Sequence, residues 1–583
     1  MKLSVTREEV AAARREVWRG FARYRAAGIS LVVLLAIILA FPPARSASTR
    51  AGDTSSGPVG PAPADIAAPR ATDSATSGGS SAGADDGEGG SGSGERPLPA
   101  NCDPNTGRIK FPSVYAPPCV YPVVENGGAT YQGVTGGEIK IVLYRAQPDP
   151  TVDSLIRAAG AADTREDIMA TYRVWLDMFQ NNFETYGRRV TLQTIDGSGP
   201  TDDDAAARAD AIKVATQIKP FAVFGGPPPF VDELARRGIV CITQAQRPKE
   251  YFEERAPFVY GTQMSSSQVF LQLAEYIGKR LWKKNAIHAG DAEFRSQKRK
   301  FGLIYSDTPE GIYRPGVAYF EKELARYGAK LTDKVSYEGD INRAQELARV
   351  VVSRLKEKGI TSVLFSGDPV APIFFTQEAT NQGWFPEWVL SGGTLVDTNF
   401  FGRTYDQRQW SRAFGMSQLW IRPPQEVNEP HYQHVWHTGS PPRAKATYEI
   451  LYQEPLVLFT AIHMAGPNLN PRTFRDGLFS YPVSGKGLIT QLQRSFGRQG
   501  VWPFDDYTGF DTVTEVWWDP SSRGNDEVGN AGAGQFQFVD GGKRYAPGEW
   551  PTSDPKVFTR NGARTSYDSL PPSDVYPKYP KPK

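Results

Sequence analysis

The fold is decided by residues 203–243, which read DDAAARADAIKVATQIKPFAVFGGPPPFVDELARRGIVCIT. Residues 203–217 have the apolar spacing of an amphipathic helix, and residues 221–224 and 239–242 are short apolar runs typical of buried strands. This alternation of helix and buried strand is typical of βαβ units, which build parallel sheets with helices on both faces.

The same rhythm continues in both directions along the chain. Further strands are expected at residues 139–144, 190–195, 300–305, 362–365 and 388–390, and further helices at residues 168–183, 267–281, 317–327, 342–358 and 373–382. The chain is therefore predicted to be an α/β protein. Several predicted strands end in small residues or proline, as at Gly225 and Gly226 and at Gly392 and Gly393. Ligands of open α/β sheets bind beyond the carboxyl ends of the strands, so these turns are the expected binding site.

Length and composition limit the possible classes of protein. The chain has 583 residues, so two or more domains are expected. Its 66 Lys and Arg residues nearly balance its 64 Asp and Glu residues, which argues against a surface built to bind nucleic acid. The 40% hydrophobic fraction is enough for a sizeable core and excludes wholesale disorder. Three cysteines are too few for a disulfide scaffold or a cysteine-rich zinc module.

The N-terminal region carries a membrane signal. Residues 26–41 (AAGISLVVLLAIILAF) are uncharged and apolar, and residues 1–25 before them are basic, which places the N-terminus in the cytoplasm and the rest of the chain outside. An uncleaved transmembrane signal anchor is favoured, and a cleaved secretion signal is the alternative. Residues 45–100 are rich in Gly, Ser, Ala and Pro and lack aromatic residues, so they are predicted to be a disordered linker.

Cys102 and Cys119 bracket a proline-rich segment that is expected to lie outside the cytoplasm, where oxidation is favoured. A disulfide between them would contribute on the order of 3 kcal/mol, and two free thiols are the alternative. Cys241 stands in a predicted buried strand and is expected to be a packed, free thiol.

Five segments together resemble a known family. They are GVTGGEIKIVLY (residues 133–144), the run from Asp196 through AAARADAIKVATQIKPFAVFGG, GIVCITQAQRPKEY (residues 238–251), SVLFSGDPVAPIFFTQEATNQG (residues 362–383) and DDYTGFDTVTEVWWD (residues 505–519). In order and spacing they resemble type I periplasmic binding proteins, the leucine/branched-chain amino-acid-binding family of ABC transporter substrate-binding proteins. The resemblance implies two α/β lobes joined by three crossing strands, near residues 260–263, 414–419 and 502–511, with a ligand captured by hinge closure.

The sequence and the resemblance together give a domain organisation, in which only the two lobes rest on the resemblance. The predicted parts are a cytoplasmic basic segment (1–25), the anchor (26–41), the linker (45–100), a disulfide-linked proline-rich cap (101–133), the binding domain (134–519) and a proline-rich extended tail (546–583). Lobe 1 is expected at about 134–260 and 420–501, and lobe 2 at about 264–413 and 512–545. The composition of the tail is typical of extended polyproline that contacts a partner.

The residues expected to contact a ligand lie in the loops after the strands of both lobes. They are Arg145, Gln147, Gly225, Gly226, Gln244, Gln246 and Arg247 in lobe 1, and Tyr313, Asp368 and Thr394 in lobe 2. The acidic residue with which the family binds an amino acid's ammonium group falls near Gly393, so ordinary α-amino acids are not the expected ligands. The two arginines favour a carboxylate- or amide-bearing ligand, unless they only form surface ion pairs.

The predicted function is that of a membrane-tethered extracytoplasmic solute-binding protein that serves an ABC importer, without a cofactor and without nucleic acid as a partner. A ligand-sensing ectodomain that acts through a partner is an alternative. An alternative of a different class is an exported metal-dependent enzyme that uses His431, His434 and His437. Because positions i and i+6 point apart on a helix, a solvated helix is favoured there. No motif joins a nucleophile to a base, so no enzyme is expected, and the basic run at residues 295–300 is expected to be a solvated loop.

Overall fold

A computed structural model describes residues 98–121, 123, 125–147, 163–199, 203–244, 246–307, 311, 313–338, 343–393 and 395–580. The predicted anchor and most of the predicted linker lie outside these residues. Among the described residues, no helix is both long enough and apolar enough to span a membrane.

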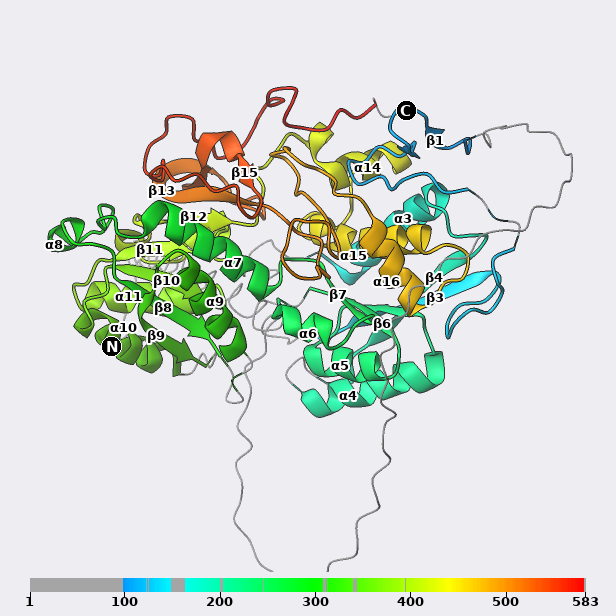
Figure 1. The fold of residues 1–583 in the computed structure, drawn as a ribbon, viewed down its shortest axis with the longest axis horizontal. Helices are drawn as coiled ribbons and strands as arrows, with labels where there is room; N and C mark the ends of the chain where they lie inside the picture. Colours follow the sequence, from blue (N-terminus) through cyan, green and yellow to red (C-terminus); the bar gives the residue numbers. More distant parts are fainter. Residues whose placement is uncertain are drawn as a thin grey trace, which may run out of the picture. The chain divides into compact units, whose positions relative to one another are not determined.

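The first lobe is built on a five-stranded parallel sheet with the strand order β4-β3-β5-β6-β7. Its strands are β3 (Glu138–Arg145), β4 (Arg189–Asp196), β5 (Ala222–Phe224), β6 (Val240–Thr243) and β7 (Val259–Gly261). Its helices are α3 (Arg165–Asn182), α4 (Asp204–Lys213), α5 (Pro228–Arg236), α6 (Lys249–Glu253), α14 (Glu429–Thr438), α15 (Tyr448–Ala465) and α16 (Pro471–Ser480), with a π-helical turn η1 (Val214–Ile218) and a 3-10 turn η4 (Gln425–Val427). Helices α4 and α5 pack together beside the sheet, as do α15 and α16 (Figure 1).

The second lobe repeats this topology. Its strands are β8 (Phe301–Ser306), β9 (Leu331–Tyr337), β10 (Ser362–Ser366), β11 (Glu387–Leu390) and β12 (Ala413–Ser417), which are parallel and ordered β9-β8-β10-β11-β12. Strands β13 (Val513–Asn525), β14 (Ala531–Phe538) and β15 (Arg544–Tyr545) extend the sheet in antiparallel pairing. Its helices are α7 (Ser266–Tyr276), α8 (Ala292–Arg295), α9 (Arg314–Arg326), α10 (Ala344–Glu357), α11 (Ala371–Asn381), α12 (Asn399–Gly402) and α13 (Gln407–Trp410), with the turns η2 (Ile277–Leu281) and η5 (Val539–Gly542).

Strand β8 shows why the second sheet is covered on both faces. Its residues are buried throughout, and alternate side chains join two different hydrophobic clusters. Leu303 and Tyr305 pack with side chains of α7 and α9, whereas Ile304 packs with side chains of α10 and α11. A strand buried on both faces has a continuous apolar sequence rather than an alternating one, as the sequence predicts. All strands and helices expected from the pattern are present.

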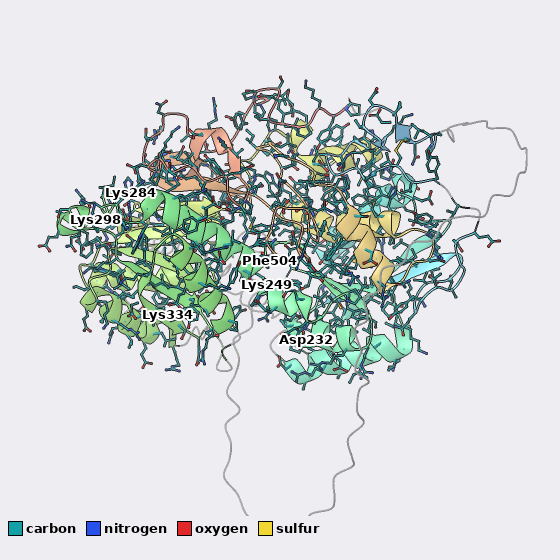
Figure 2. All side chains as sticks on the ribbon, in the orientation of Figure 1. Asp232, Lys249, Lys284, Lys298, Lys334 and Phe504 are labelled. Carbon is teal, nitrogen blue, oxygen red and sulfur yellow. A yellow bond between two sulfur atoms is a disulfide. The ribbon has the colours of Figure 1, made fainter. Side chains whose placement is uncertain are left out.

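The chain passes between the lobes after β7, after β12 and before β13. The first and third passages run side by side, because the Gly261 N–H donates to the Tyr507 carbonyl at 2.9 Å. At the third passage, the Lys249 ammonium lies 5.8 Å from the centroid of the Phe504 ring (Figure 2). The passages lie in the three segments where the sequence leads us to expect them.

Arg544 holds the second and third passages together. Its guanidinium donates to the carbonyls of Gln418 (2.9 Å) and Leu419 (2.8 Å) and, through Nε, to Thr512 Oγ1 (3.0 Å). Burial lowers the pKa of Arg544 to about 9. Through these hydrogen bonds the Arg544 side chain joins the second and third passages at the hinge.

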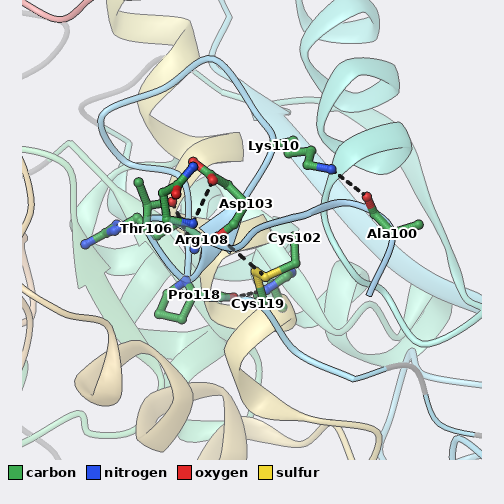
Figure 3. The surroundings of a disulfide bond; sticks show 10 residues. Ala100, Cys102, Asp103, Thr106, Arg108, Lys110, Pro118 and Cys119 are labelled. Atoms are coloured by element: carbon green, nitrogen blue, oxygen red, sulfur yellow. Dashed lines mark hydrogen bonds between the residues drawn. A yellow bond between two sulfur atoms is a disulfide. The ribbon is translucent and has the colours of Figure 1, made fainter. Parts of the chain in front are cut away.

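The disulfide prediction is confirmed. Cys102 and Cys119 are bonded, with Cα atoms 5.6 Å apart (Figure 3), and Cys241 is a buried free thiol. The closed loop packs on lobe 1, because the buried Phe111 ring lies 5.3 Å from Phe183 in an edge-on contact. The loop thus covers the side of lobe 1 that α3 and α15 form.

The double substitution Cys102→Ser, Cys119→Ser is expected to lower the free energy of unfolding by about 3 kcal/mol, because the open loop gains conformational entropy in the unfolded chain. Urea denaturation followed by circular dichroism measures the difference. Reductant should lower the stability of the unaltered protein by a similar amount and leave the variant unchanged. A reductant effect that persists in the variant would contradict the assignment.

The C-terminal tail is not a free extended segment. It lacks regular secondary structure, but it packs along lobe 2 through Trp550 and Phe558 and then reaches lobe 1. There the Ile489 N–H donates to the Val575 carbonyl at 3.0 Å, and the Tyr579 ring stacks on Tyr432 with centroids 4.5 Å apart. The tail is therefore a fourth connection between the lobes, and its contact with a partner stays a prediction.

Candidate ligand-binding cleft

A cleft with a volume of about 1190 Å³ lies at the carboxyl ends of strands from both lobes. Its lobe 1 wall follows β3, β5 and β6 and comprises Tyr144, Ala146, Gly225, Gly226, Pro227, Pro228, Thr243 and Gln244. Its lobe 2 and hinge wall comprises Gly392, Leu395, Asp397, Thr398, Asn399, Phe400, Phe401, Gln418, Leu419, Trp420 and Phe510. A side arm extends past the second passage and includes Arg422, Lys445, Tyr448, Glu449 and Glu527.

The lobe 1 wall is shaped by two glycines and a row of prolines. Gly225 and Gly226 have φ of 72° and 94°, and a Cβ on Gly226 would lie 2.4 Å from the Phe230 ring. Glycine is required there for both reasons. Pro228 begins α5 and Pro227 is its N-cap, so the cleft meets proline rings at the start of this helix.

The lobe 2 wall carries a buried acid. Asp397 is 4% exposed and accepts a hydrogen bond from Ser417 Oγ at 2.5 Å. Burial raises the pKa of Asp397 to about 6, because the carboxylate is removed from water. Next to it, the Glu527 carboxylate accepts the N–H groups of Asn399 and Phe400 at 2.9 Å each, which fixes the start of α12.

Two glutamine side chains of the cleft form hydrogen bonds within the protein. Gln418 Nε2 donates to the Gly392 carbonyl at 2.5 Å, and Gln418 Oε1 accepts the Met264 N–H at 3.1 Å. Gln418 therefore ties the first passage to the loop after β11. Under the lobe 1 wall, burial raises the pKa of Glu454 to about 7, and Gln244 and Tyr172 hydrogen-bond to this carboxyl group.

The strand order of the two sheets and the passages between them identify the fold. Two sheets with the same strand order, joined by three passages, form the arrangement that the resemblance implies. The fold is that of the type I periplasmic binding proteins.

Comparisons with known proteins find similar solved structures but no similar sequences. No protein-family model matches the chain, and no curated protein matches it. The branched-chain amino acid transporter substrate-binding protein LivJ from Streptococcus pneumoniae, in complex with isoleucine, is 13% identical over 69% of this chain and 99% of its own, with a TM-score of 0.43. An ABC transporter substrate-binding protein from Sphaerobacter thermophilus is 14% identical over 71% of this chain and 100% of its own, with a TM-score of 0.47. A solute-binding protein of an ABC transporter from Rhodopseudomonas palustris HaA2, in complex with p-hydroxybenzoic acid, is 11% identical over 70% and 97%, with a TM-score of 0.46.

Three of the predicted ligand contacts of this type I binding fold line the cleft: Gly225, Gly226 and Gln244. Gln246 does not line the cleft, and its Nε2 donates to the Met264 carbonyl at 3.2 Å. Gln147 is exposed and does not line the cleft, and Thr394 lies outside the described residues.

Three predicted contacts have partners within the protein instead. Arg145 forms an ion pair with Asp196 at 3.1 Å, the alternative that the sequence left open. Asp368 accepts the N–H groups of Val370 and Ala371 at 2.9 Å each, as a cap at the start of α11. Arg247, the third, is paired across the two lobes. None of these side chains lines the cleft.

Arg247 and Tyr313 form a latch between the lobes. The guanidinium carbon lies 5.4 Å from the Tyr313 ring centroid, and Nη1 donates to the tyrosine hydroxyl at 3.3 Å. The sequence identifies both residues as parts of the site, but the structure brings them to each other. A cation over an aromatic ring at a partly buried position contributes on the order of 1 kcal/mol.

Arg247→Ala is expected to widen the distribution of interlobe distances, because it removes both contacts of the latch. Spin labels at Glu254 and Arg326, which are exposed on α6 and α9, report this distance by pulsed electron resonance. The native cysteines are bonded or buried, so only introduced cysteines are labelled. Tyr313→Phe, which keeps the ring, is the matched control and should broaden the distribution less. Equal distributions in all three proteins would contradict the latch.

The three clustered histidines have separate partners. His434 Nδ1 lies 2.7 Å from the Ser440 carbonyl, and His437 Nε2 lies 2.9 Å from Asp177 Oδ2. The His431 ring is in edge contact with Tyr448 instead. Within the part of the chain that the structure describes, no three His, Cys, Asp or Glu side chains are grouped to hold a metal ion. The geometry therefore gives the metal-enzyme alternative no support.

Sequence reasoning missed the acidic wall of the cleft. Asp397 follows the end of β11 by seven residues, after the glycine turn at Gly392, and the Phe400–Phe401 pair follows within α12. The turn itself is among the expected sites, so a longer reading of the loop that follows it would have included Asp397. Glu527 comes from the β13–β14 connection, and no local signal links it to the site.

Proposed function

We propose that the protein is an extracytoplasmic solute-binding protein, tethered to the membrane by residues 26–41, that captures a small molecule and delivers it to an ABC importer. The observation that carries this proposal is the cleft, which lies at the carboxyl ends of strands from both lobes and is lined by both. Three passages at one side of the cleft allow it to open and close.

Hinge closure gives such a cleft its function. A ligand shifts the equilibrium toward the closed form only through contacts that it makes better in that form. Gly226 and Gln244 on lobe 1 and Asp397 on lobe 2 line the cleft and are placed to supply such contacts. The amide side chains suit a ligand with amide or similar polar groups, as the sequence leads us to expect. The sequence also leads to the expectation of a carboxylate end on the ligand, but Arg145 and Arg247, on which that expectation rested, have partners within the protein.

The tether is supported by the sequence of the N-terminal region. Its basic flank and apolar run are typical of an anchor with a cytoplasmic N-terminus, and the linker is long enough to hold the lobes away from the bilayer. Fractionation of cells that express the full chain tests the tether directly. The protein should stay in the membrane fraction after a high-salt wash, and release by the wash would overturn this part.

Co-purification tests the binding function. Native mass spectrometry of the full chain, extracted in mild detergent, should show a bound small molecule that is lost on unfolding. Gln244→Trp, which fills the cleft, should reduce the bound fraction by about ten-fold, a loss of about 1.4 kcal/mol. Gln377→Trp, an exposed position on α11 away from the cleft, is the matched control. Equal occupancy in both variants would overturn the assignment of the cleft.

A further inference from the structure

Resting on the proposed function, we infer that the cleft takes a ligand with an apolar body whose polar end donates hydrogen bonds, a protonated amine or an amide, and that it does not take a carboxylate. The inference follows from what each described group around the cleft already binds.

The start of α5 faces the cleft but lacks the donors that bind anions. Helix N-termini hold anions because their first N–H groups are unpaired. Here Pro227, Pro228 and Pro229 have no N–H group, and the Gly225 N–H already donates to the Ile242 carbonyl at 3.0 Å. Of these positions only Gly226 keeps an N–H that the structure does not pair. A carboxylate at this position would therefore face proline rings in place of N–H donors.

The other helix starts near the cleft are occupied by carboxylates of the protein. Glu527 accepts the first N–H groups of α12. Asp163 accepts the N–H groups of Ala446 and Thr447 at the start of α15. Each of these acids holds the place that a ligand carboxylate would need.

The described cationic side chains of the cleft either donate to carbonyls of the protein or lie in the side arm. Arg422 lines the side arm, but its guanidinium donates to the carbonyls of Asn525 (2.9 Å) and Asp526 (3.1 Å). Lys445 is exposed at the same arm. Burial lowers the pKa of His431, which also lines the arm, so its ring is neutral at pH 7. At the strand ends themselves, the described wall holds no cation.

The groups that the cleft does offer accept hydrogen bonds or are apolar. Asp397 lines the cleft beside the end of β12, where Ser417 Oγ donates to it, and Glu527, which fixes the adjacent start of α12, adds a second carboxylate to the same wall. Pro228, Leu395 and Phe400 supply apolar surface on both walls. An amine placed at Asp397 gains a charge-assisted hydrogen bond, whereas a carboxylate there meets two like charges.

Three probes with one body separate the possibilities: 4-phenylbutylamine, 4-phenylbutyramide and 4-phenylbutyrate. Calorimetry with the full chain in detergent, after removal of any co-purified molecule, should show the amine and the amide binding at least about ten-fold more tightly than the acid. The acid binding as tightly as the amine would overturn the inference and leave the proposed function standing. No binding by any probe would overturn the inference as well, and co-purification would then decide the proposed function separately.

Asp397→Asn should weaken binding of the amine by about ten-fold or more and change binding of the amide by less than about two-fold, because only the charge is removed. Asp406→Asn is the matched control, since Asp406 caps α13 away from the cleft. A loss of amide binding equal to that of the amine would contradict the role of the charge.

Restoring N–H donors at the start of α5 should favour binding of a carboxylate. The double substitution Pro227→Ser, Pro228→Ala returns two N–H groups and places a favoured N-cap residue at the start of the helix. It should strengthen binding of 4-phenylbutyrate by about five-fold or more, which is about 1 kcal/mol. Pro471→Ala, which restores an N–H at the start of α16 outside the cleft, should have no effect. Unchanged binding of the acid by the double variant would count against the inference.

Discussion

Trp550→Ala is expected to lower the free energy of unfolding by about 3–5 kcal/mol, although this residue stands in the segment predicted to be a proline-rich extended tail. Trp550 is 2% exposed and stacks on Tyr545 with ring centroids 4.4 Å apart. Its ring also meets Tyr276 of α7 at 4.8 Å, and its Nε1 donates to Gln272 at 2.9 Å. Removal of the ring leaves a cavity and takes away the donor to the buried Oε1 of Gln272, and both losses are costly.

Urea denaturation followed by far-ultraviolet circular dichroism measures this change without using tryptophan fluorescence. Leu570→Ala is the matched control in the same tail, because Leu570 is 48% exposed. The control should change the stability by less than about 0.5 kcal/mol. A similar small effect of Trp550→Ala would show that the tail is not part of the core of lobe 2.

Arg299→Met is expected to lower the free energy of unfolding by about 3–5 kcal/mol, because it leaves a buried carboxylate without its cation. Arg299 donates to both oxygens of Glu387, at 2.7 and 2.9 Å, and Glu387 is fully buried. The same carboxylate accepts a hydrogen bond from Ser362 Oγ at 2.7 Å. Ser362 pairs in register with Phe301 on one side and with Glu387 on the other, so β10 brings the two charges together.

Two further variants separate the pair from the general effect of losing a charge. Lys298→Met, at the exposed neighbouring position (Figure 2), should change the stability by less than about 0.5 kcal/mol. The double variant Arg299→Met, Glu387→Leu should be more stable than Arg299→Met alone by about 2 kcal/mol or more, because no unpaired charge remains. A double variant that is less stable than the single one would contradict the explanation.

The basic run at residues 295–300 shows where the sequence pattern misleads. As a local composition it is typical of a solvated loop, and Lys298 and Lys300 are exposed. Arg299 is instead buried. It pairs with Glu387, which stands 88 residues further along the chain. No property of the run itself marks the one cation that is paired in the interior.

The candidate binding residues also differ in how far the sequence alone reveals them. Gly225 and Gly226 were predictable, because the ends of parallel strands and the small residues that follow them are visible in a single sequence. Arg247 and Tyr313 were identified as site residues, but only the arrangement of the lobes shows that they contact each other. Glu527 has no local signal at all, since it reaches α12 from the connection between β13 and β14.

The sequence by itself determined the α/β class, the expected strands and helices between residues 139 and 390 and the Cys102–Cys119 bond, and the resemblance implied the three passages between the lobes. The class, the elements and the bond depend on apolar periodicity and on short-range spacing, both of which a single chain displays. Only the tertiary structure decided that the tail returns to lobe 1, that Arg299 is buried and that the helix starts around the cleft are already filled. The physical reason is that burial and pairing of charges depend on partners far away in sequence, and the fold alone sets which partners meet.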